Sequence, residues 1–508
     1  MRRVLVVFTV ALATIMAGAW PAAGASTNAE SVLQPSPSDR ANRVDFNGDG
    51  FDDLAIGVPG EGFGGLGLEQ AGAVNVLYGA AGGLVGTDQL LTQANPEASD
   101  FFGAALAKGD FNGDGFTDLA VSAPQEGSTT IGPAGAVNVF YGSAAGLPAT
   151  SQVLTQANPE DGDFFGRALD AGLFNDDAFM DLAVGAPGEA LGMTEWAGAV
   201  NVFYGSAAGL PASSQVLHQA NPESFDQFGA ALAAGFFNAG EGDLAVGAPG
   251  EWLGTTREAG AVNVFYGTPS GLPGVSQILI QGNPETADRF GSALAAGFFD
   301  NDLWYDLAVG APTEDVGANA NAGAVNVFFG SASTGLAGSA RQSFVQGPGT
   351  GGTAEPGDRF GTTLAAGFFD AGGPWDLAVG APAEDVGARV DAGAVNVLYG
   401  SATGLGGRNQ LLVQGSPGLL GTAESGDRFG SALARGIFFN DFNNDGLADL
   451  AVGAVDEDVG AISNAGAVNV LYGSVSGLPG TGGQLFTQDS PGVADTAEPG
   501  DLLGWALD

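Results

Sequence analysis

The sequence predicts an all-β fold, a seven-bladed β-propeller of four-stranded antiparallel blades. An Asp-Leu-Ala strand recurs seven times, at intervals of 62 to 73 residues. Gly and Pro separate short apolar segments that show no helical period, as expected for many short strands joined by turns. The two ends of the chain each carry part of one repeat. Repeats of this length indicate one large body built from small units, not several independent domains. The Asp-Leu-Ala strands begin at Asp53, Asp118, Asp181, Asp243, Asp306, Asp376 and Asp449.

Each repeat contains four strand-like segments in a fixed order. In the second repeat a Phe-Gly segment begins at Phe102 and an acidic loop runs from Asp110 to Asp118. The Asp-Leu-Ala strand then ends at a turn marked by Pro124, and an Ala-Gly-Ala-Val-Asn-Val segment begins at Ala134. A looser segment between two Gln residues follows. Four short strands in sequence predict one antiparallel meander, which is a propeller blade.

The two chain ends predict how the ring closes. A Phe-Gly segment precedes six of the seven Asp-Leu-Ala strands, and the first strand lacks one. Residues 501–508 form a seventh copy that has no Asp-Leu-Ala partner after it. We therefore expect residues 44–508 to form the propeller, with 501–508 completing the first blade. Such closure by strands from both termini leaves no unpaired sheet edge.

The N-terminal segment is typical of a secreted protein. Residues 1–25 combine Arg2 and Arg3, an apolar run and a small-residue cleavage site, which predicts a signal peptide. An uncleaved anchor is the alternative, but the apolar run is short for a membrane span. Residues 26–43 predict a flexible leader. No second apolar segment follows, so we expect no stable membrane span after cleavage and a secreted or cell-surface location.

The charge balance limits the partners. The chain has 57 Asp and Glu against 14 Lys and Arg, a formal charge of −43, which repels nucleic acid and anionic lipid and favours cations. Solubility alone is the alternative explanation for the acidic excess. There is no Cys, and His218 is the only histidine, which excludes thiolate chemistry, a His-containing triad and a His-rich metal centre.

Three acidic loops predict Ca²⁺ sites. Each places Asp or Asn at positions 1, 3, 5 and 9, a backbone carbonyl at position 7 and Gly at position 6, an oxygen set that suits Ca²⁺ better than Mg²⁺. An EF-hand is excluded because its final Glu would fall at Ile56, Val121 and Val452. A solvated Asp/Asn/Gly turn is the alternative. The candidate ligands are Asp45, Asn47, Asp49, Phe51 (carbonyl) and Asp53; Asp110, Asn112, Asp114, Phe116 (carbonyl) and Asp118; and Asp441, Asn443, Asp445, Leu447 (carbonyl) and Asp449.

The other loops have lost ligands to different degrees. The third and fifth loops have Leu173 and Phe298 at position 1 and are weaker candidates, whereas we expect the fourth and sixth to bind nothing. The weaker candidate ligands are Asn175, Asp177, Asp181, Asp300, Asp302 and Asp306.

A second acidic pattern follows the turn after each Asp-Leu-Ala strand. Because successive turns of a meander alternate between faces, these Glu residues are expected opposite the metal loops. They are candidates for a ligand face, with two Trp residues as anchors; the alternative is turn carboxylates that accept backbone hydrogen bonds. The candidates are Glu61, Glu126, Glu189, Glu251, Glu314, Glu384, Glu457, Trp196 and Trp252.

These motifs together resemble the FG-GAP repeats of the integrin alpha-subunit head. Phe-Gly, the acidic loop and Gly-Ala-Pro, as at Gly185-Ala186-Pro187, recur over residues 44–508. The resemblance implies a seven-bladed propeller with Ca²⁺ in the hairpins of one face and ligand contacts on the other. The pattern departs from the family at Val58, Ser122 and Val455.

The expected function is a secreted, calcium-binding, non-catalytic module for extracellular binding or adhesion. Its partner would be an extracellular or cell-surface protein or glycan, and nucleic acid is excluded. Phospholipase D enzymes with such repeats also have a His-rich catalytic domain, which favours the prediction that this chain is not an enzyme. The alternative is a carbohydrate-active enzyme or lectin that uses loop carboxylates and Trp on the face opposite the calcium loops.

Overall fold

The computed structural model describes residues 43–63, 68–127, 132–434, 440–478 and 482–508. The predicted signal peptide (1–25) and all but the last residue of the predicted leader (26–43) lie outside this range. The described residues form 27 strands in seven sheets. Among the described residues there is no helical segment that could span a lipid bilayer.

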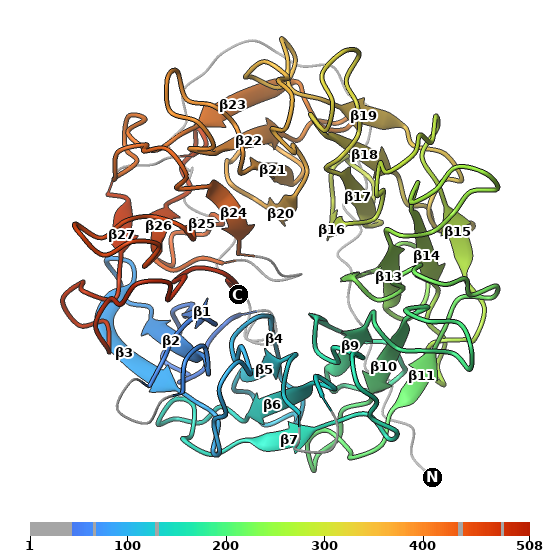
Figure 1. The fold of residues 1–508 in the computed structure, drawn as a ribbon, viewed down its shortest axis with the longest axis horizontal. Helices are drawn as coiled ribbons and strands as arrows, with labels where there is room; N and C mark the ends of the chain where they lie inside the picture. Colours follow the sequence, from blue (N-terminus) through green and yellow to red (C-terminus); the bar gives the residue numbers. More distant parts are fainter. Residues whose placement is uncertain (1–42, 64–67, 128–131, 435–439, 479–481) are drawn as a thin grey trace, which may run out of the picture. The chain divides into compact units, whose positions relative to one another are not determined.

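The sheets are arranged as blades around a central channel, with the first two strands of each blade nearest the channel (Figure 1). The innermost strands are β4 (Leu106–Gly109), β8 (Ala168–Gly172), β12 (Ala231–Gly235), β16 (Ala293–Gly297), β20 (Thr363–Gly367) and β24 (Phe429–Leu433). The second strands are β1 (Leu54–Val58), β5 (Asp118–Ala123), β9 (Asp181–Ala186), β13 (Asp243–Ala248), β17 (Asp306–Ala311), β21 (Asp376–Ala381) and β25 (Leu450–Ala454).

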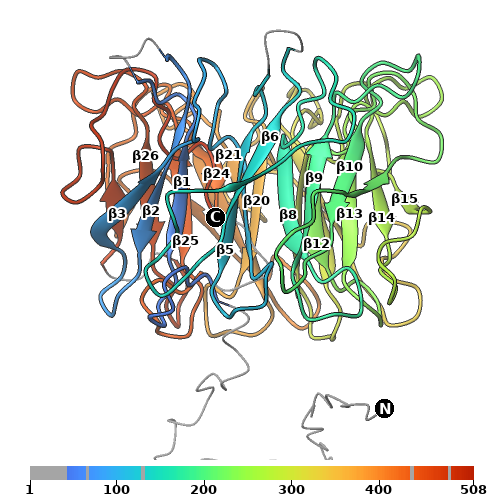
Figure 2. The same cartoon turned by 90° about the horizontal axis from the view of Figure 1, so that it is seen from below.

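The outer half of each blade completes the antiparallel meander, and loops cover both faces of the ring (Figure 2). The third strands are β2 (Ala73–Tyr78), β6 (Ala136–Phe140), β10 (Ala199–Phe203), β14 (Ala261–Phe265), β18 (Ala324–Phe328), β22 (Ala394–Tyr399) and β26 (Ala467–Leu471). The outermost strands are β3 (Val85–Leu91), β7 (Gln152–Leu154), β11 (Gln215–Leu217), β15 (Gln277–Leu279), β19 (Gln342–Phe344), β23 (Arg408–Leu412) and β27 (Gln484–Phe486).

The first blade is completed by the C-terminus. Leu507 pairs antiparallel with Ile56 of β1, and the backbones of Ala55 and Asp508 exchange hydrogen bonds of 2.9 and 3.1 Å. The Asp53 N–H donates to the Val44 carbonyl at 2.6 Å, so the N-terminal segment continues the same strand position. The predicted all-β, seven-bladed fold closed by both termini is confirmed.

A buried ion pair ties the closure to the next blade. The Lys108 ammonium lies 3.0 Å from the Asp508 carboxylate and donates to the Asn440 amide oxygen at 2.9 Å. Both charged side chains are almost fully buried. Removing one partner would leave an uncompensated buried charge, so this contact fixes the C-terminus in place.

The second strands are buried along their whole length, as in the six residues Asp118 to Ala123. They lie in the middle of a blade that has neighbours on both faces, which explains why their sequences read as continuous apolar runs without alternation. The Gly of the Gly-Ala-Pro segment serves this packing: a Cβ at Gly57 would overlap the Gly103 carbonyl of the next blade. Ser122 departs from this Gly, and its hydroxyl accepts a hydrogen bond from the Ala105 N–H at 2.8 Å.

A ring of leucines, one from each blade, closes the central channel. None of these side chains is more than 5% exposed. They separate a cavity of about 700 Å³ at one mouth of the channel from a narrow space of about 40 Å³ beyond it. The ring consists of Leu106, Leu169, Leu232, Leu294, Leu364, Leu433 and Leu507.

Candidate metal centres and the opposite face

The first acidic loop lies between Val44 and β1 and is shaped by its own side chains. The Asp45 carboxylate accepts hydrogen bonds from the backbone N–H groups of Gly48 (2.5 Å), Asp49 (3.1 Å) and Gly50 (2.8 Å). The Asn47 amide oxygen accepts from the Asp49 N–H at 2.8 Å. Gly50 has φ of +92°, a left-handed conformation that Gly adopts at little cost. The loop therefore wraps tightly around its own oxygen atoms.

The second and seventh loops repeat this arrangement. Asp110 accepts from Gly113, Asp114 and Gly115 at 2.7, 3.2 and 2.9 Å. Asp441 accepts from Asp445 and Gly446 at 2.9 and 2.8 Å.

The Asp at position 9 anchors each loop to its blade. The Asp53 carboxylate accepts from the Phe46 N–H at 2.8 Å and from the Gly79 N–H at 2.9 Å. The pKa of Asp53 is raised to about 8, mainly by burial and also by the nearby carboxylates of Asp45 and Asp49. Burial likewise raises the pKa of Asp118 to about 8. A group of carboxyls that resists ionisation in this way would be stabilised by a bound cation.

The donor set of these loops fits a hard divalent cation, because it consists of carboxylate, amide and carbonyl oxygens. Asp45, Asn47, Asp49 and Asp53, with their counterparts in the second and seventh loops, would hold it. Arg43 lies between the first and seventh loops, where it donates to the Gly50 carbonyl and, at 2.6 Å, to the Asn444 amide oxygen. The assignment of these residues as ligands stays a prediction.

The two weaker loops keep part of this arrangement. In the third, Asn175 accepts from the Asp177 N–H at 3.1 Å. In the fifth, carboxylate oxygens of Asp300, Asp302 and Asp306 all lie within 4.8 Å of one another. Neither loop has an Asp at position 1 to gather the backbone N–H groups. Their metal-binding role also stays a prediction.

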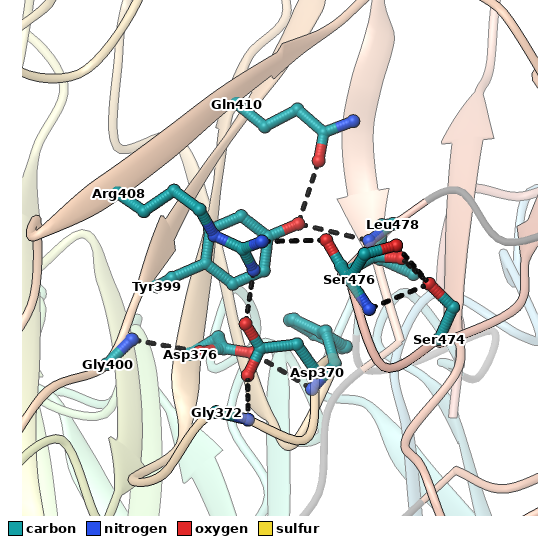
Figure 3. Close-up of polar contacts among 12 residues, drawn as sticks. Asp370, Gly372, Asp376, Tyr399, Gly400, Arg408, Gln410, Ser474, Ser476 and Leu478 are labelled. Carbon is teal, nitrogen blue, oxygen red and sulfur yellow. Dashed lines mark hydrogen bonds and ion pairs between the residues drawn. The ribbon is translucent and has the colours of Figure 1, made fainter.

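The sixth loop carries its own positive charge, which sequence reasoning missed. Arg408, at the start of β23, forms an ion pair with Asp370 and donates to the Ser476 carbonyl at 2.7 Å (Figure 3). Its guanidinium lies 3.5 Å from the centre of the Tyr399 ring, which adds a cation–π contact. An arginine thus forms an ion pair with the carboxylate of the sixth loop.

The seven turn Glu residues lie opposite the metal loops and are bound between blades. Each accepts a hydrogen bond of 2.5–2.7 Å from a Gln that follows the outer strand of the preceding blade. We call these the Gln–Glu pairs. They are Gln93–Glu126, Gln156–Glu189, Gln219–Glu251, Gln281–Glu314, Gln346–Glu384, Gln414–Glu457 and Gln488–Glu61.

In these pairs each Glu accepts a hydrogen bond from a side-chain amide of the preceding blade, a structural role that neither the ligand-face interpretation nor its backbone-bonded alternative included. Glu61 and Glu384 are buried and the other five are half-buried. The pKa of Glu61 is raised to about 8, mainly by burial and also by the nearby carboxylate of Asp501. The pKa of Glu251 is also raised to about 8, mainly by burial and also by the nearby carboxylate of Asp226. Ligand contact by the Glu residues stays a prediction.

The two candidate Trp residues are each 37% exposed. The Trp196 ring packs against Phe164 with centroids 5.6 Å apart, and the Arg257 guanidinium lies 4.8 Å from the centre of the Trp252 ring. Their surfaces are accessible, and their role as ligand anchors also stays a prediction.

Comparison with known families identifies the repeats. A family model described as FG-GAP repeat matches residues 43–77 and 102–140. The chain carries FG-GAP repeats. It is 30% identical to integrin alpha-3 of Mus musculus over 213 residues, 41% of this chain and 19% of the relative. The predicted resemblance to the integrin alpha-subunit propeller is therefore confirmed.

A second group of relatives consists of enzymes. The chain is 32% identical over 294 residues to phosphatidylinositol-glycan-specific phospholipase D of Rattus norvegicus, covering 54% of this chain and 34% of that protein. It is 29% identical over 423 residues to the Bos taurus protein of the same name, covering 81% and 42%. The chain therefore spans about a third to two-fifths of the length of these relatives.

These relatives correct the predicted function. The expectation of a non-catalytic adhesion module, and of a chain that is not an enzyme, is wrong because the similarity extends to named phospholipases D as well as to integrins. The prediction failed because it treated the propeller as a complete functional unit and gave the integrin likeness more weight than the phospholipase likeness. The same relatives point to divalent-cation binding and to an extracellular or cell-surface location.

Proposed function

We propose that this chain acts in the hydrolysis of phosphatidylinositol-glycans, as the Ca²⁺-binding propeller that positions the glycan part of the substrate. The observation that carries the proposal is the similarity to phosphatidylinositol-glycan-specific phospholipases D of four mammals, at 29–32% identity. The bovine alignment extends over 81% of this chain, so most of the ring takes part in the likeness.

The metal loops support Ca²⁺ as the cation. Their oxygen ligands come from one short turn with four side-chain groups, and Ca²⁺ accepts six to eight such ligands in flexible geometry. Mg²⁺ requires a stricter octahedron and usually keeps several waters. With Ca²⁺ bound, the three complete loops would form a rigid arc, because ring closure makes the seventh, first and second blades neighbours.

The location follows from the substrate and the N-terminus. Phosphatidylinositol-glycans offered at a cell surface would be met by a secreted protein, and residues 1–25 have the features of a signal peptide. We therefore place the mature protein outside the cell.

The test uses the purified chain, vesicles that carry a phosphatidylinositol-glycan-anchored reporter, and matched vesicles of phosphatidylinositol alone. We expect Ca²⁺-dependent retention on the glycan-bearing vesicles and release of the reporter into the supernatant. Equal retention on both vesicles, with no reporter released, would contradict the proposal. An EDTA-treated sample and a variant with Asp49→Asn, Asp114→Asn and Asp445→Asn serve as matched controls for the cation.

A further inference from the structure

The cavity of about 700 Å³ lies on the ring axis, at the face opposite the metal loops. Each inner strand begins at this cavity and ends at an acidic loop, as β4 does before Asp110. The leucine ring forms the floor. All seven blades contribute the residue that directly follows Phe-Gly or its Leu-Gly counterpart, so the wall is a ring of equivalent positions: Ala104, Arg167, Ala230, Ser292, Thr362, Ser431 and Trp505.

The sizes of these wall residues create the space. Five of the seven are Ala, Ser or Thr, which leaves an open well above the leucines. The two large residues are Arg167 and Trp505, and the Trp505 side chain is 41% exposed. Arg167 is an exposed residue, and its guanidinium has no ion pair or side-chain hydrogen bond with the described residues. An unpaired guanidinium in a well of this kind is a binding group for an anion.

Two more arginines stand at the rim. Arg359 and Arg428 occupy the position just before the Phe of Phe-Gly, where the backbone is left-handed in every blade. The same position holds Arg289 in the fifth blade and Phe, Gln or Leu in the other four, so the scaffold is constant and the side chain varies. Variable side chains on a rigid scaffold are the usual means by which a repeat fold acquires a binding site.

The local charge is opposite to that of the whole molecule. Three arginines line the cavity, in a chain with only 14 Lys and Arg against 57 Asp and Glu. Asp391 also lines it, and Asp456 lies 3.1 Å from the Arg428 guanidinium, so these two acids offset part of the charge. Arg167 and Arg359 remain as the positive groups. A volume of about 700 Å³ is in the range of small-ligand pockets.

We propose that this channel-mouth cavity binds an anionic saccharide, with Arg167 and Arg359 as the cationic groups of its wall and Trp505 as the surface for the sugar ring. Guanidinium groups bind phosphate and carboxylate through paired N–H donors, and an exposed indole offers a flat apolar surface. The inference rests on the proposed function in one respect: a phosphatidylinositol-glycan contains a phosphorylated sugar-like ring. The cavity would give the glycan its binding site.

Calorimetric titration of the intact, Ca²⁺-saturated chain tests the site. The probes are inositol 1-phosphate, glucose 6-phosphate and glucuronic acid, with glucose and inorganic phosphate for comparison. We expect at least one anionic sugar to bind about tenfold or more tightly than glucose and than inorganic phosphate. Preference for the phosphorylated sugars would assign a phosphate ligand, and preference for glucuronic acid would assign a carboxylate ligand. Equal binding of glucose, or no binding of any anionic sugar, would overturn the site.

Variants locate the binding. Arg167→Gln should weaken binding about tenfold or more, and Ala230→Trp should block it by filling the well without changing the charge. The matched control is Arg289→Gln, because Arg289 holds the same sequence position as Arg359 but is paired with Glu258 at 2.8 Å and does not line the cavity. Melting temperatures show that each variant is folded. Loss of binding in Arg289→Gln equal to that in Arg167→Gln would overturn the assignment.

The vesicle assay separates this inference from the proposed function. If Arg167→Gln retains and releases the glycan-anchored reporter as the wild type does, the cavity assignment fails and the proposed function stands. If the wild type binds anionic sugars but neither retains nor releases the reporter, the proposed function fails and the cavity assignment stands.

Discussion

The two faces of the ring carry two repeated sets of carboxylates that have different partners. On one face, Asp45 and Asp49 share a short turn with other oxygen groups and are held by backbone N–H groups. On the other face, Glu61 lies between two blades and accepts a hydrogen bond from the neutral side chain of Gln488 at 2.7 Å. Both sets are acidic and repeat around the ring. The partners differ: the loop carboxylates accept hydrogen bonds from backbone N–H groups, whereas Glu61 accepts one from a side-chain amide and has carboxylate oxygens of Glu498 and Asp501 close to its own.

The sixth loop differs from the complete acidic loops because its positive charge comes from the protein itself. Asp370 keeps its place in the loop, but Arg408 from the outer strand supplies the positive charge. A loop of this kind would be stabilised by the chain itself. The comparison therefore predicts which loops respond to metal removal and which do not.

The largest effect is expected from removing the cations. EDTA should lower the melting temperature by roughly 10 °C, and excess Ca²⁺ should restore it, because each site filled at a hundred times its Kd adds about 2.7 kcal/mol. Differential scanning calorimetry measures the change. A melting temperature that is the same in EDTA and in Ca²⁺ would contradict the claim that the acidic loops bind a cation.

The second effect is a pH dependence of stability to which the Gln–Glu pairs contribute. Folding raises the pKa of Glu251 from 4.5 to about 8, so the folded state binds the proton more tightly. Protonation therefore stabilises the fold, fully below about pH 4.5, and this stabilisation is lost as pH rises through about 8. In EDTA the melting temperature should fall between pH 5 and pH 8.

The variant Glu251→Gln isolates this contribution, because it keeps a hydrogen-bond partner for Gln219 and removes the titration. Its melting temperature should depend less steeply on pH than that of the wild type over the same range. An unchanged slope would show that Glu251 does not hold a proton in the folded state.

A smaller effect is expected from Arg408→Gln. Removing the guanidinium leaves Asp370 without its charge partner, which should cost about 1–2 kcal/mol because the arginine is partly exposed. The loss should appear with and without Ca²⁺. Arg289→Gln is the matched control, an exposed pair that should cost less than about 1 kcal/mol. A loss in Arg408→Gln no greater than in this control would mean that the sixth loop needs no positive charge.

The smallest effect concerns the fifth loop. Asp302→Asn should change the protection by Ca²⁺ by less than roughly 1 °C, since this loop lacks the position-1 Asp that shapes the complete loops. Asp114→Asn is the comparison and should remove a full site. Equal losses in the two variants would show that the three clustered carboxyls of the fifth loop suffice for binding.

Much of the fold could be predicted because its signals are local and repeated. The spacing of the Asp-Leu-Ala strands predicted the number of blades, and the unpaired copy at 501–508 predicted that the C-terminus closes the ring. The acidic loops could also be recognised, since all their candidate ligands lie within nine residues. These features depend on residues that are close in sequence.

The rest depends on contacts that the repeat alone does not reveal. Arg408 reaches Asp370 from 38 residues away, and no other blade repeats this arginine. The Gln–Glu pairs did leave a signal in the sequence, because the Gln and the Glu are 32 or 33 residues apart in the second to fifth blades. This spacing identifies the pairs only if one already assumes that residues of neighbouring blades contact each other. The cavity arises only where seven blades meet. The similarity to the phospholipases D extends over much of the chain, and no single motif of the sequence indicates it.

The most direct test is the number of Ca²⁺ ions bound per chain, measured by equilibrium dialysis with metal analysis. The wild type is compared with the variant that combines Asp49→Asn, Asp114→Asn and Asp445→Asn. Our account predicts that the variant loses three Ca²⁺ ions, one from each complete loop. The same number of bound ions in both proteins would contradict it.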